Sequence, residues 1–82
     1  MNRIQIIETL KTLLGAQKKI KIDVHAVTET TRIDQMGFDS ISILDFMYEV
    51  ETAFDTRIEV ADLVRMELVR DLIDHLHGKV AR

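Results

Sequence analysis

The amino-acid sequence predicts an all-α fold. Proline is absent and only three glycines occur, so few residues interrupt helices. Apolar residues recur at helical spacing in several segments. The chain has 82 residues and a mass of 9.5 kDa, the size of one small domain spanning residues 1–82. Because cysteine is absent, no disulfide can form, and we expect packing alone to hold the domain together.

The first expected helix spans about residues 2–14, and Gly15 is expected to end it in the left-handed conformation. Its apolar residues follow at spacings of three and four: Ile4, Ile7, Leu10 and Leu14. No helical period continues through residues 16–38, where we expect an ordered loop with apolar anchors. Within this loop, Thr31 and Asp34 have the spacing of a helix cap, which predicts one helical turn ending at Gly37.

The strongest periodicity runs from about Ser40 to Phe54. Its apolar residues are Ile43, Met47, Val50 and Phe54, with Leu44 and Phe46 beside them. Asp39 and Ser40 are both suited to the N-terminus of this helix, and Ser42 with Asp45 has the spacing of a capping box, so the first residue stays open. A short helix is expected around Val60, Leu63 and Val64. A last helix is expected over about residues 67–77, with Gly78 ending it.

Charge is unevenly distributed along the chain, although the net charge is only −3. Residues 1–22 hold five basic residues, including Lys18 and Lys19, against one acidic residue, whereas residues 23–82 hold six basic against thirteen acidic residues. The stretch from Asp39 to Asp55 contains acidic residues but no Lys or Arg, which favours a basic protein partner. The acidic balance and the 5% aromatic content argue against nucleic-acid binding.

No apolar run is long enough for a membrane span or a signal peptide, so we expect a cytoplasmic monomer that does not bind membranes. Only Met1 and Asn2 precede the first expected helix and only residues 79–82 follow the last. This favours a free-standing protein over a domain excised from a larger synthase.

The sequence gives no support for catalysis or metal binding. The two serines, Ser40 and Ser42, lie at a helix start rather than in a Gly-x-Ser-x-Gly turn. His75 and His77 are two positions apart, so on a helix they point in nearly opposite directions and cannot hold one metal ion. We expect the histidines, including His25, to be surface residues, and we expect no enzymatic activity.

The segment Met36-Gly37-Phe38-Asp39-Ser40-Ile41 is the main candidate for chemistry. Gly37 permits a tight turn, Phe38 can anchor that turn on the core, and Ser40 then lies at the start of a helix. The positive end of the helix dipole would stabilise a phosphate ester on Ser40. From spacing alone, simple helix capping by Asp39 and Ser40 explains the same residues.

The hexapeptide resembles the phosphopantetheine attachment site of acyl carrier proteins, whose signature is Leu-Gly-x-Asp-Ser-Leu. The resemblance extends through the lead-in at Thr31, Ile33 and Met36. It continues through Glu51-Thr52-Ala53-Phe54-Asp55-Thr56-Arg57-Ile58 and through Val69-Arg70-Asp71-Leu72-Ile73-Asp74. It therefore covers about residues 31–76 and implies a four-helix bundle with three long helices, one short helix and a long first loop.

The resemblance also implies function. A phosphopantetheinyl transferase would esterify Ser40 with 4'-phosphopantetheine from coenzyme A, with Asp39 and Gly37 as neighbouring site residues. The chain would then carry acyl groups as thioesters in a fatty-acid, polyketide or other specialised acyl pathway. The absence of cysteine fits this chemistry, because no protein thiol would compete for the thioester.

Two further sets of residues follow from the resemblance. Residues expected to dock acyl-loading, elongating or transferring enzymes with basic patches are Asp39, Ile41, Asp45, Glu49, Glu51 and Asp55. Candidates for lining an acyl pocket, with ordinary core packing as the alternative, are Phe46, Met47, Val50, Leu63, Val64 and Leu72.

The chain departs from the pattern of fatty-acid carriers. Ser42, Thr52 and Ala53 stand where those carriers usually have acids, and Arg57 reverses a common acidic position, so different partners are expected. Leu68 occupies the usual cap position of the last helix. An aminoacyl or peptidyl carrier and an unmodified helical docking module remain alternatives.

Overall fold

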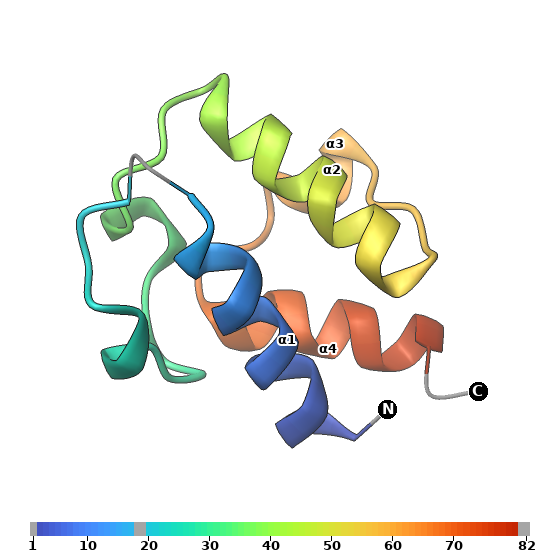
Figure 1. The fold of residues 1–82 in the computed structure, drawn as a ribbon. Coiled ribbons are helices and arrows are strands. Elements are labelled where there is room, and N and C mark those ends of the chain that lie inside the picture. Colours follow the sequence, from blue (N-terminus) through green and yellow to red (C-terminus); the bar gives the residue numbers. More distant parts are fainter. Residues whose placement is uncertain (1, 18–19, 81–82) are drawn as a thin grey trace.

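The computed structural model describes residues 2–17 and 20–80. Within these ranges the chain forms four helices and no strand: α1 (Arg3–Gly15), α2 (Ser42–Phe54), α3 (Val60–Leu63) and α4 (Val69–Val80). Figure 1 shows α2 above the crossing helices α1 and α4, with the long first loop at one end and α3 beside α2. The predicted all-α four-helix architecture is confirmed. Lys18 and Lys19 of the basic N-terminal part and residues 1, 81 and 82 lie outside the described residues.

The N-terminus of α1 is fixed by a reciprocal cap. The side chain of Asn2 accepts a hydrogen bond from the Gln5 backbone N–H at 2.8 Å, and the Asn2 backbone N–H donates to the Gln5 side chain at 2.9 Å. The predicted role of Gly15 is wrong. Gly15 is the last helical residue, and the Ala16 N–H ends the helix by donating to the Leu13 carbonyl at 3.2 Å in a right-handed conformation.

The long first loop is ordered by two single 3₁₀ turns, Val24–Ala26 and Ile33–Gln35. The second turn lies where a helical turn was predicted, but the predicted cap is wrong. Its N-cap is Arg32, whose side chain makes no capping bond. The Thr31 hydroxyl instead accepts from the Thr28 backbone N–H at 2.8 Å.

Backbone hydrogen bonds join this loop to the start of α4. The Ile33 N–H donates to the Glu67 carbonyl at 2.9 Å, and the Val69 N–H donates to the Thr31 carbonyl at 2.9 Å. Arg3 of α1 adds ion pairs to Glu29 in the loop and to Asp74 in α4. These contacts fix the loop relative to the helices on either side of it.

The core forms where α1, α2 and α4 meet. Its buried apolar side chains are Ile6, Leu10, Leu14, Val27, Ile33, Met36, Phe46, Met47, Val50, Phe54, Val69, Leu72, Ile73 and Leu76. Because α3 contributes no buried residue, it covers the bundle rather than forming its centre. Ser40 and Ile41, which precede α2, and Val60 and Val64, at the two ends of α3, are exposed at the surface of the bundle. Figure 1 shows where these two helices lie.

The last helix differs from the prediction at both ends. It begins at Val69, and it continues through Gly78 to Val80, so the predicted stop at Gly78 is wrong. Leu68, at the usual cap position, has no polar side chain. The Asp71 carboxylate reaches back to accept from the Leu68 N–H at 3.0 Å and the Glu67 N–H at 2.9 Å. These two bonds also lower the pKa of Asp71 below its ordinary value.

Candidate functional site

The loop before α2 turns sharply at Gly37. Gly37 has a φ of 96°, a conformation that residues with a Cβ rarely adopt. On either side of it, Met36 is buried in the core and Phe38 stacks on Phe46, with 5.1 Å between ring centroids. The glycine therefore provides the bend, and its two neighbours anchor the bend to the bundle and to α2.

Asp39 and Ser42 cap α2 reciprocally. Asp39 Oδ1 accepts from the Ser42 N–H at 2.7 Å and from the Ile41 N–H at 3.0 Å, while Ser42 Oγ accepts from the Asp39 N–H at 2.9 Å. The helix consequently begins at Ser42 rather than at Ser40. The predicted pairing of Ser42 with Asp45 is wrong, because the Ser42 hydroxyl faces the preceding turn.

Ser40 and Ser42 differ in accessibility. Ser40 is exposed, and its hydroxyl makes no hydrogen bond among the described residues. Ser42 is only 8% exposed and is held by Asp39. The hydroxyl of Ser40 therefore lies free at the N-terminal end of α2, where the positive end of the helix dipole favours a phosphate group.

A groove of about 540 Å³ borders Ser40. Its apolar walls include Phe38 and Ile43 on one side and Leu63, Val64 and Met66 on the other. At its polar edge lies Arg32, whose Nη2 contacts Asp34 Oδ2 at 2.8 Å. This ion pair lowers the pKa of Asp34. The groove thus combines an exposed hydroxyl with an adjoining apolar surface.

The predicted acyl-pocket residues fall into three places. Leu63 and Val64 border the groove beside Ser40, and Val64 is 76% exposed. Phe46, Met47 and Leu72 border an internal cavity of about 10 Å³. Such a cavity has room for about one water molecule. Val50 is completely buried and borders neither space.

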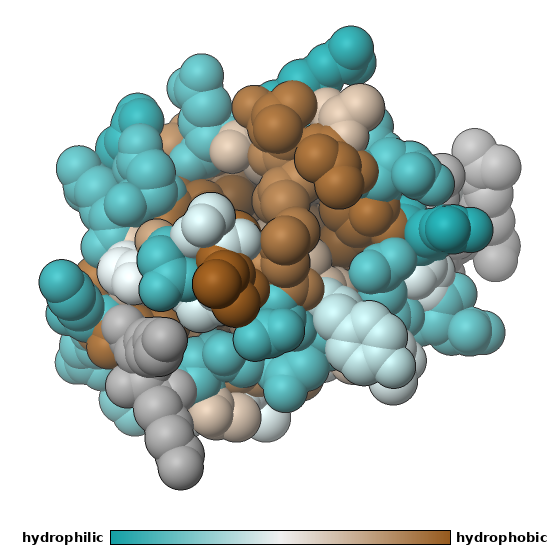
Figure 2. Space-filling view, turned by 90° about the horizontal axis from the view of Figure 1, so that it is seen from above, coloured by the Kyte–Doolittle hydropathy of each residue, from teal (hydrophilic) through white to brown (hydrophobic). Residues whose placement is uncertain are grey.

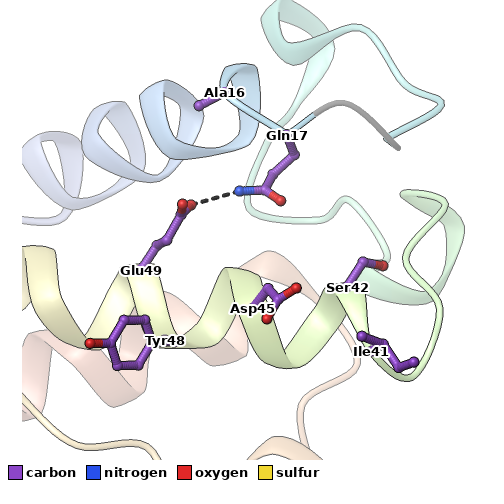
Figure 3. A pocket seen from close by; sticks show the side chains of 7 residues that line it. All are labelled: Ala16, Gln17, Ile41, Ser42, Asp45, Tyr48 and Glu49. Atoms are coloured by element: carbon purple, nitrogen blue, oxygen red, sulfur yellow. Dashed lines mark hydrogen bonds between the residues drawn. The ribbon is translucent and has the colours of Figure 1, made fainter.

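Two predicted docking acids, Asp45 and Glu49, lie on one side of α2 beside the C-terminal end of α1. Glu49 Oε2 accepts from the Gln17 side chain at 2.6 Å across the gap (Figure 3). The recess between the helices has a volume of about 520 Å³ and is also bordered by Ile41 and Tyr48. Sequence reasoning missed Tyr48, although its position three residues after Asp45 places it on the same side of a helix.

The other two acids in the C-terminal half of α2 have structural contacts. Glu51 Oε2 accepts from the Ile58 N–H at 3.0 Å. Asp55 ends the helix in the left-handed conformation, with a φ of 49°, and its N–H donates to the Glu51 carbonyl. Glu51 is half-buried, whereas Asp55 remains exposed.

Exposed apolar side chains surround the acids on α2 and extend to α3. Ile41 is 72% exposed and Tyr48 70%, and Leu44, Val60 and Val64 are also exposed. Figure 2, which views the molecule from above Figure 1, shows hydrophobic side chains gathered in the middle of this face and hydrophilic ones around them. Such a patch with a polar rim is typical of a protein interaction surface.

The histidines are separate from this site. His25 is exposed, but His75 and His77 are half-buried on α4, and the buried Nε2 of His75 has no hydrogen-bond partner. The prediction of surface histidines is confirmed for His25, whereas His75 and His77 are only partly exposed. Among the described residues no group of three or more His, Cys, Asp or Glu has a metal-binding arrangement. In the same part of the chain, no helix has the length and apolar character that a membrane crossing requires.

The chain is similar to known carriers over nearly its whole length. A family model described as a phosphopantetheine attachment site matches residues 5–76. An acyl carrier protein from Thermotoga maritima is 28% identical over 80 residues, which are 96% of each chain. One from Syntrophus aciditrophicus is 34% identical over 52 residues, covering 63% of this chain and 65% of the relative.

A solved acyl carrier protein structure from Enterococcus faecalis superposes with a TM-score of 0.76 at 26% identity, covering 95% of this chain and 98% of that one. The free hydroxyl at the start of α2 and the groove beside it also fit a covalently attached group with an extended arm. The chain therefore belongs to the acyl carrier protein family, whose members carry covalently attached 4'-phosphopantetheine.

Proposed function

We propose that Ser40 is the attachment residue and that the chain carries acyl groups, rather than catalysing a reaction, in a fatty-acid, polyketide or other specialised acyl pathway. The contrast between the two serines is the observation that carries the assignment. Ser40 is exposed and free of hydrogen bonds within the described part of the chain, whereas Ser42 is buried and bonded to Asp39. Gly37 and Asp39 shape the turn that presents Ser40.

In this proposal Ser40 forms the covalent bond, and the start of α2 provides the electrostatic environment for the attached group. Ser40 Oγ would form the phosphodiester bond by attacking the pantetheine-bearing phosphate of coenzyme A: the pyrophosphate bond would break, adenosine 3',5'-bisphosphate would leave, and a base of the transferase would take the serine proton. The α2 N-terminus would stabilise the negative charge of the attached phosphate. When bound, the group supplies a terminal thiol that holds acyl groups as thioesters. Among residues 2–17 and 20–80, neither serine hydroxyl is hydrogen-bonded to a histidine, so Ser40 depends on an external transferase for activation.

We place the acyl group first in the groove beside Ser40. This is supported by its volume of about 540 Å³ and by its apolar walls at Leu63 and Val64. The internal cavity bordered by Phe46, Met47 and Leu72 measures only about 10 Å³, so a chain enters there only if the core expands. Val50, being completely buried, serves the core.

Acyl carrier proteins interact with phosphopantetheinyl transferases and acyl-handling enzymes. We propose that basic surfaces of these partners dock on α2. Asp39, Asp45 and Glu49 supply exposed charge, and Ile41 supplies exposed apolar area next to Ser40. Asp55 adds charge at the far end of α2. Glu51, which holds the Ile58 N–H, contributes mainly to the fold.

Mass spectrometry tests the attachment. The protein is incubated with coenzyme A, magnesium and a broad-specificity phosphopantetheinyl transferase, and the intact mass and the modified peptide are then determined. We expect one phosphopantetheine on Ser40 and none on Ser42. Ser40→Ala should abolish the gain while changing the free energy of unfolding by no more than about 0.5 kcal/mol, because Ser40 is exposed.

Circular dichroism of the same samples verifies that each protein is folded. A folded wild-type protein that gains no mass would contradict the carrier assignment. It would instead favour an unmodified docking module in which Asp39 serves only as a helix cap. Modification at Ser42 would overturn the assignment of Ser40.

A further inference from the structure

Ser42 is the one buried polar side chain among the described residues. It is 8% exposed, and its Oγ accepts the Asp39 N–H at 2.9 Å. A buried hydroxyl without a partner costs stability, so this bond accounts for a polar residue at a position where an apolar one would otherwise pack. The attachment chemistry itself makes no use of Ser42.

The bond made by Ser42 closes a ring around the backbone of Ser40. In one direction Ser42 Oγ holds the Asp39 N–H, and in the other Asp39 Oδ1 holds the Ser42 N–H at 2.7 Å and the Ile41 N–H at 3.0 Å. Ser40 lies between the two ends of this ring. Its φ and ψ angles are therefore constrained from both sides, while the residue itself is exposed.

We propose that Ser42 is a positioning residue for modification of Ser40, an inference that rests on the attachment proposed above. Without the Ser42 hydroxyl, the Asp39 N–H loses its partner and the turn populates open conformations. The transferase must then order the turn before Ser40 Oγ is in line for transfer, and rates are sensitive to such misplacement. Because Ser42 is buried, it offers little area to a partner, so the loss should affect kcat more than KM for the carrier.

Steady-state kinetics of phosphopantetheine transfer test this role in the full chain. Ser42→Ala is expected to lower kcat about tenfold, corresponding to the loss of one helix cap, with KM changed less than about twofold. Ser42→Thr and Ser42→Asp each retain an oxygen acceptor for the Asp39 N–H, and at least one of them should recover most of the rate.

Thr52→Ala is the matched control in the same helix. The Thr52 hydroxyl donates to the Tyr48 carbonyl at 3.0 Å, so this variant also loses one hydroxyl hydrogen bond, but at the end of α2 far from Ser40 in sequence. We expect wild-type kinetics for it. All assays are run well below the lowest melting temperature in the set, so that each variant is folded.

Amide hydrogen exchange of the unmodified proteins gives a readout independent of the transferase. Protection of the Asp39 amide should fall in Ser42→Ala and persist in an acceptor-bearing variant. Three results would each overturn the inference. The first is a wild-type kcat in Ser42→Ala, and the second is an equal loss of rate in Thr52→Ala. The third is that neither Ser42→Thr nor Ser42→Asp recovers the rate although its Asp39 amide is protected. If wild-type protein accepts no group at all, the attachment proposal fails, and this inference fails with it.

Discussion

Residues 37–42 show how a few local interactions place one hydroxyl. Gly37 supplies a φ of 96°, Asp39 and Ser42 close the cap, and Ser40 is left exposed between them. Each interaction is short in sequence, which is why the Gly-x-Asp-Ser pattern by itself indicates a special turn. The exact pairing does not follow from the pattern, because Asp39, Ser40 and Ser42 are all good capping residues and only the orientation of the Ser42 hydroxyl decides between them.

Gly37→Ala tests the glycine. An alanine at a φ of 96° is strained, so we expect the free energy of unfolding to fall by about 1 to 2 kcal/mol. The turn that carries Ser40 should also shift, which would slow phosphopantetheine transfer. Urea denaturation and transferase rates measure the two effects. Gly15→Ala is the control, because Gly15 is helical without a positive φ and its added Cβ would meet only Val24 at 3.9 Å. An unfolding free energy for Gly37→Ala equal to that of wild type would show that the turn relaxes without strain.

At the scale of the elements, helix ends were harder to predict than helix interiors. The apolar periodicity indicated α1, α2 and α4 to within three residues at each end. It was less exact about the buried side of α1, where Ile4 of the predicted apolar stripe is 72% exposed and Ile6 is buried instead. Helix ends depend on weaker, interchangeable signals. Gly15 and Gly78 are both helical, and α4 is capped from within by Asp71 rather than by the residue at its N-cap.

The Asp71 cap predicts a pH dependence for α4. Hydrogen bonds from Leu68 and Glu67 lower the pKa of Asp71 in the folded protein. The stabilisation is therefore present above the unfolded pKa of about 3.9 and is lost as the pH falls through the folded pKa. Asp71→Asn should reduce the free energy of unfolding by about 1 kcal/mol at pH 7.

Denaturant titrations at several pH values measure this difference. The stability gap between wild type and Asp71→Asn should begin to shrink below about pH 4, where Asp71 of the unfolded chain takes up a proton, and it should be lost once the pH falls below the lowered pKa of the folded carboxyl. Asp62→Asn serves as a control, since no hydrogen bond of the Asp62 side chain occurs among the described contacts. A gap that stays constant from pH 7 to pH 3 would mean that the charge of Asp71 does not contribute to the cap.

At the scale of the whole molecule, the bundle separates a compact core from the surface on which the proposed site lies. The three long helices bury most of the apolar side chains, and the small size of the internal cavity shows that the core is well filled. Ser40, the groove and the exposed apolar and acidic residues of α2 and α3 all lie on the outside of this core. In the function proposed above, cargo and partners would therefore meet the same face.

Acyl loading should raise the melting temperature. An octanoyl group on the phosphopantetheine arm can contact Leu63 and Val64 in the groove, and a group that binds the folded state alone stabilises it. We expect the octanoyl form to melt several degrees above the unloaded form. Val64→Asn should remove this difference while shifting the unloaded form by less than about 4 °C, because Val64 is 76% exposed.

Met47→Ala distinguishes the groove from the interior. This change enlarges the internal cavity, so it should lower the melting temperature of both forms without removing the gap between them. If the octanoyl and unloaded wild-type proteins have the same melting temperature, the six predicted acyl-pocket residues contribute only to core packing or to the surface and do not bind the acyl group.

Charge on α2 should control association with basic partners. Binding of the transferase should slow about tenfold between low salt and about 1 M NaCl, because salt screens the exposed acids. At low salt, Glu49→Gln should slow association about two- to fivefold. Stopped-flow or surface plasmon resonance kinetics measure these rates.

Glu8→Gln is the matched control for charge. Glu8 is exposed on α1, and its neutralisation changes the net charge by the same amount without altering α2. We expect Glu8→Gln to slow association with the transferase much less than Glu49→Gln does. A salt-independent association rate, or equal effects of Glu8→Gln and Glu49→Gln, would argue against docking through the acids of α2.

Local patterns in the amino-acid sequence are enough to specify the all-α fold, the family and the unusual turn around Ser40. Each of these depends on interactions within a few residues: helical periodicity, a glycine that permits a positive φ, and an Asp-Ser pair before a helix. Such patterns can be recognised without knowing what packs against what.

The packing of the helices and loops gives residues of the same chemical type different contacts and different burial. Only folding shows that Glu49 reaches Gln17 while Glu51 holds the Ile58 N–H, and that Leu63 borders a groove while Val50 is buried. Local sequence cannot distinguish these members of the acidic and apolar sets, because their roles depend on side chains that other helices and loops bring beside them. Burial and contact arise from the relative placement of α1, α2, α3 and α4, and that placement exists only in the folded chain.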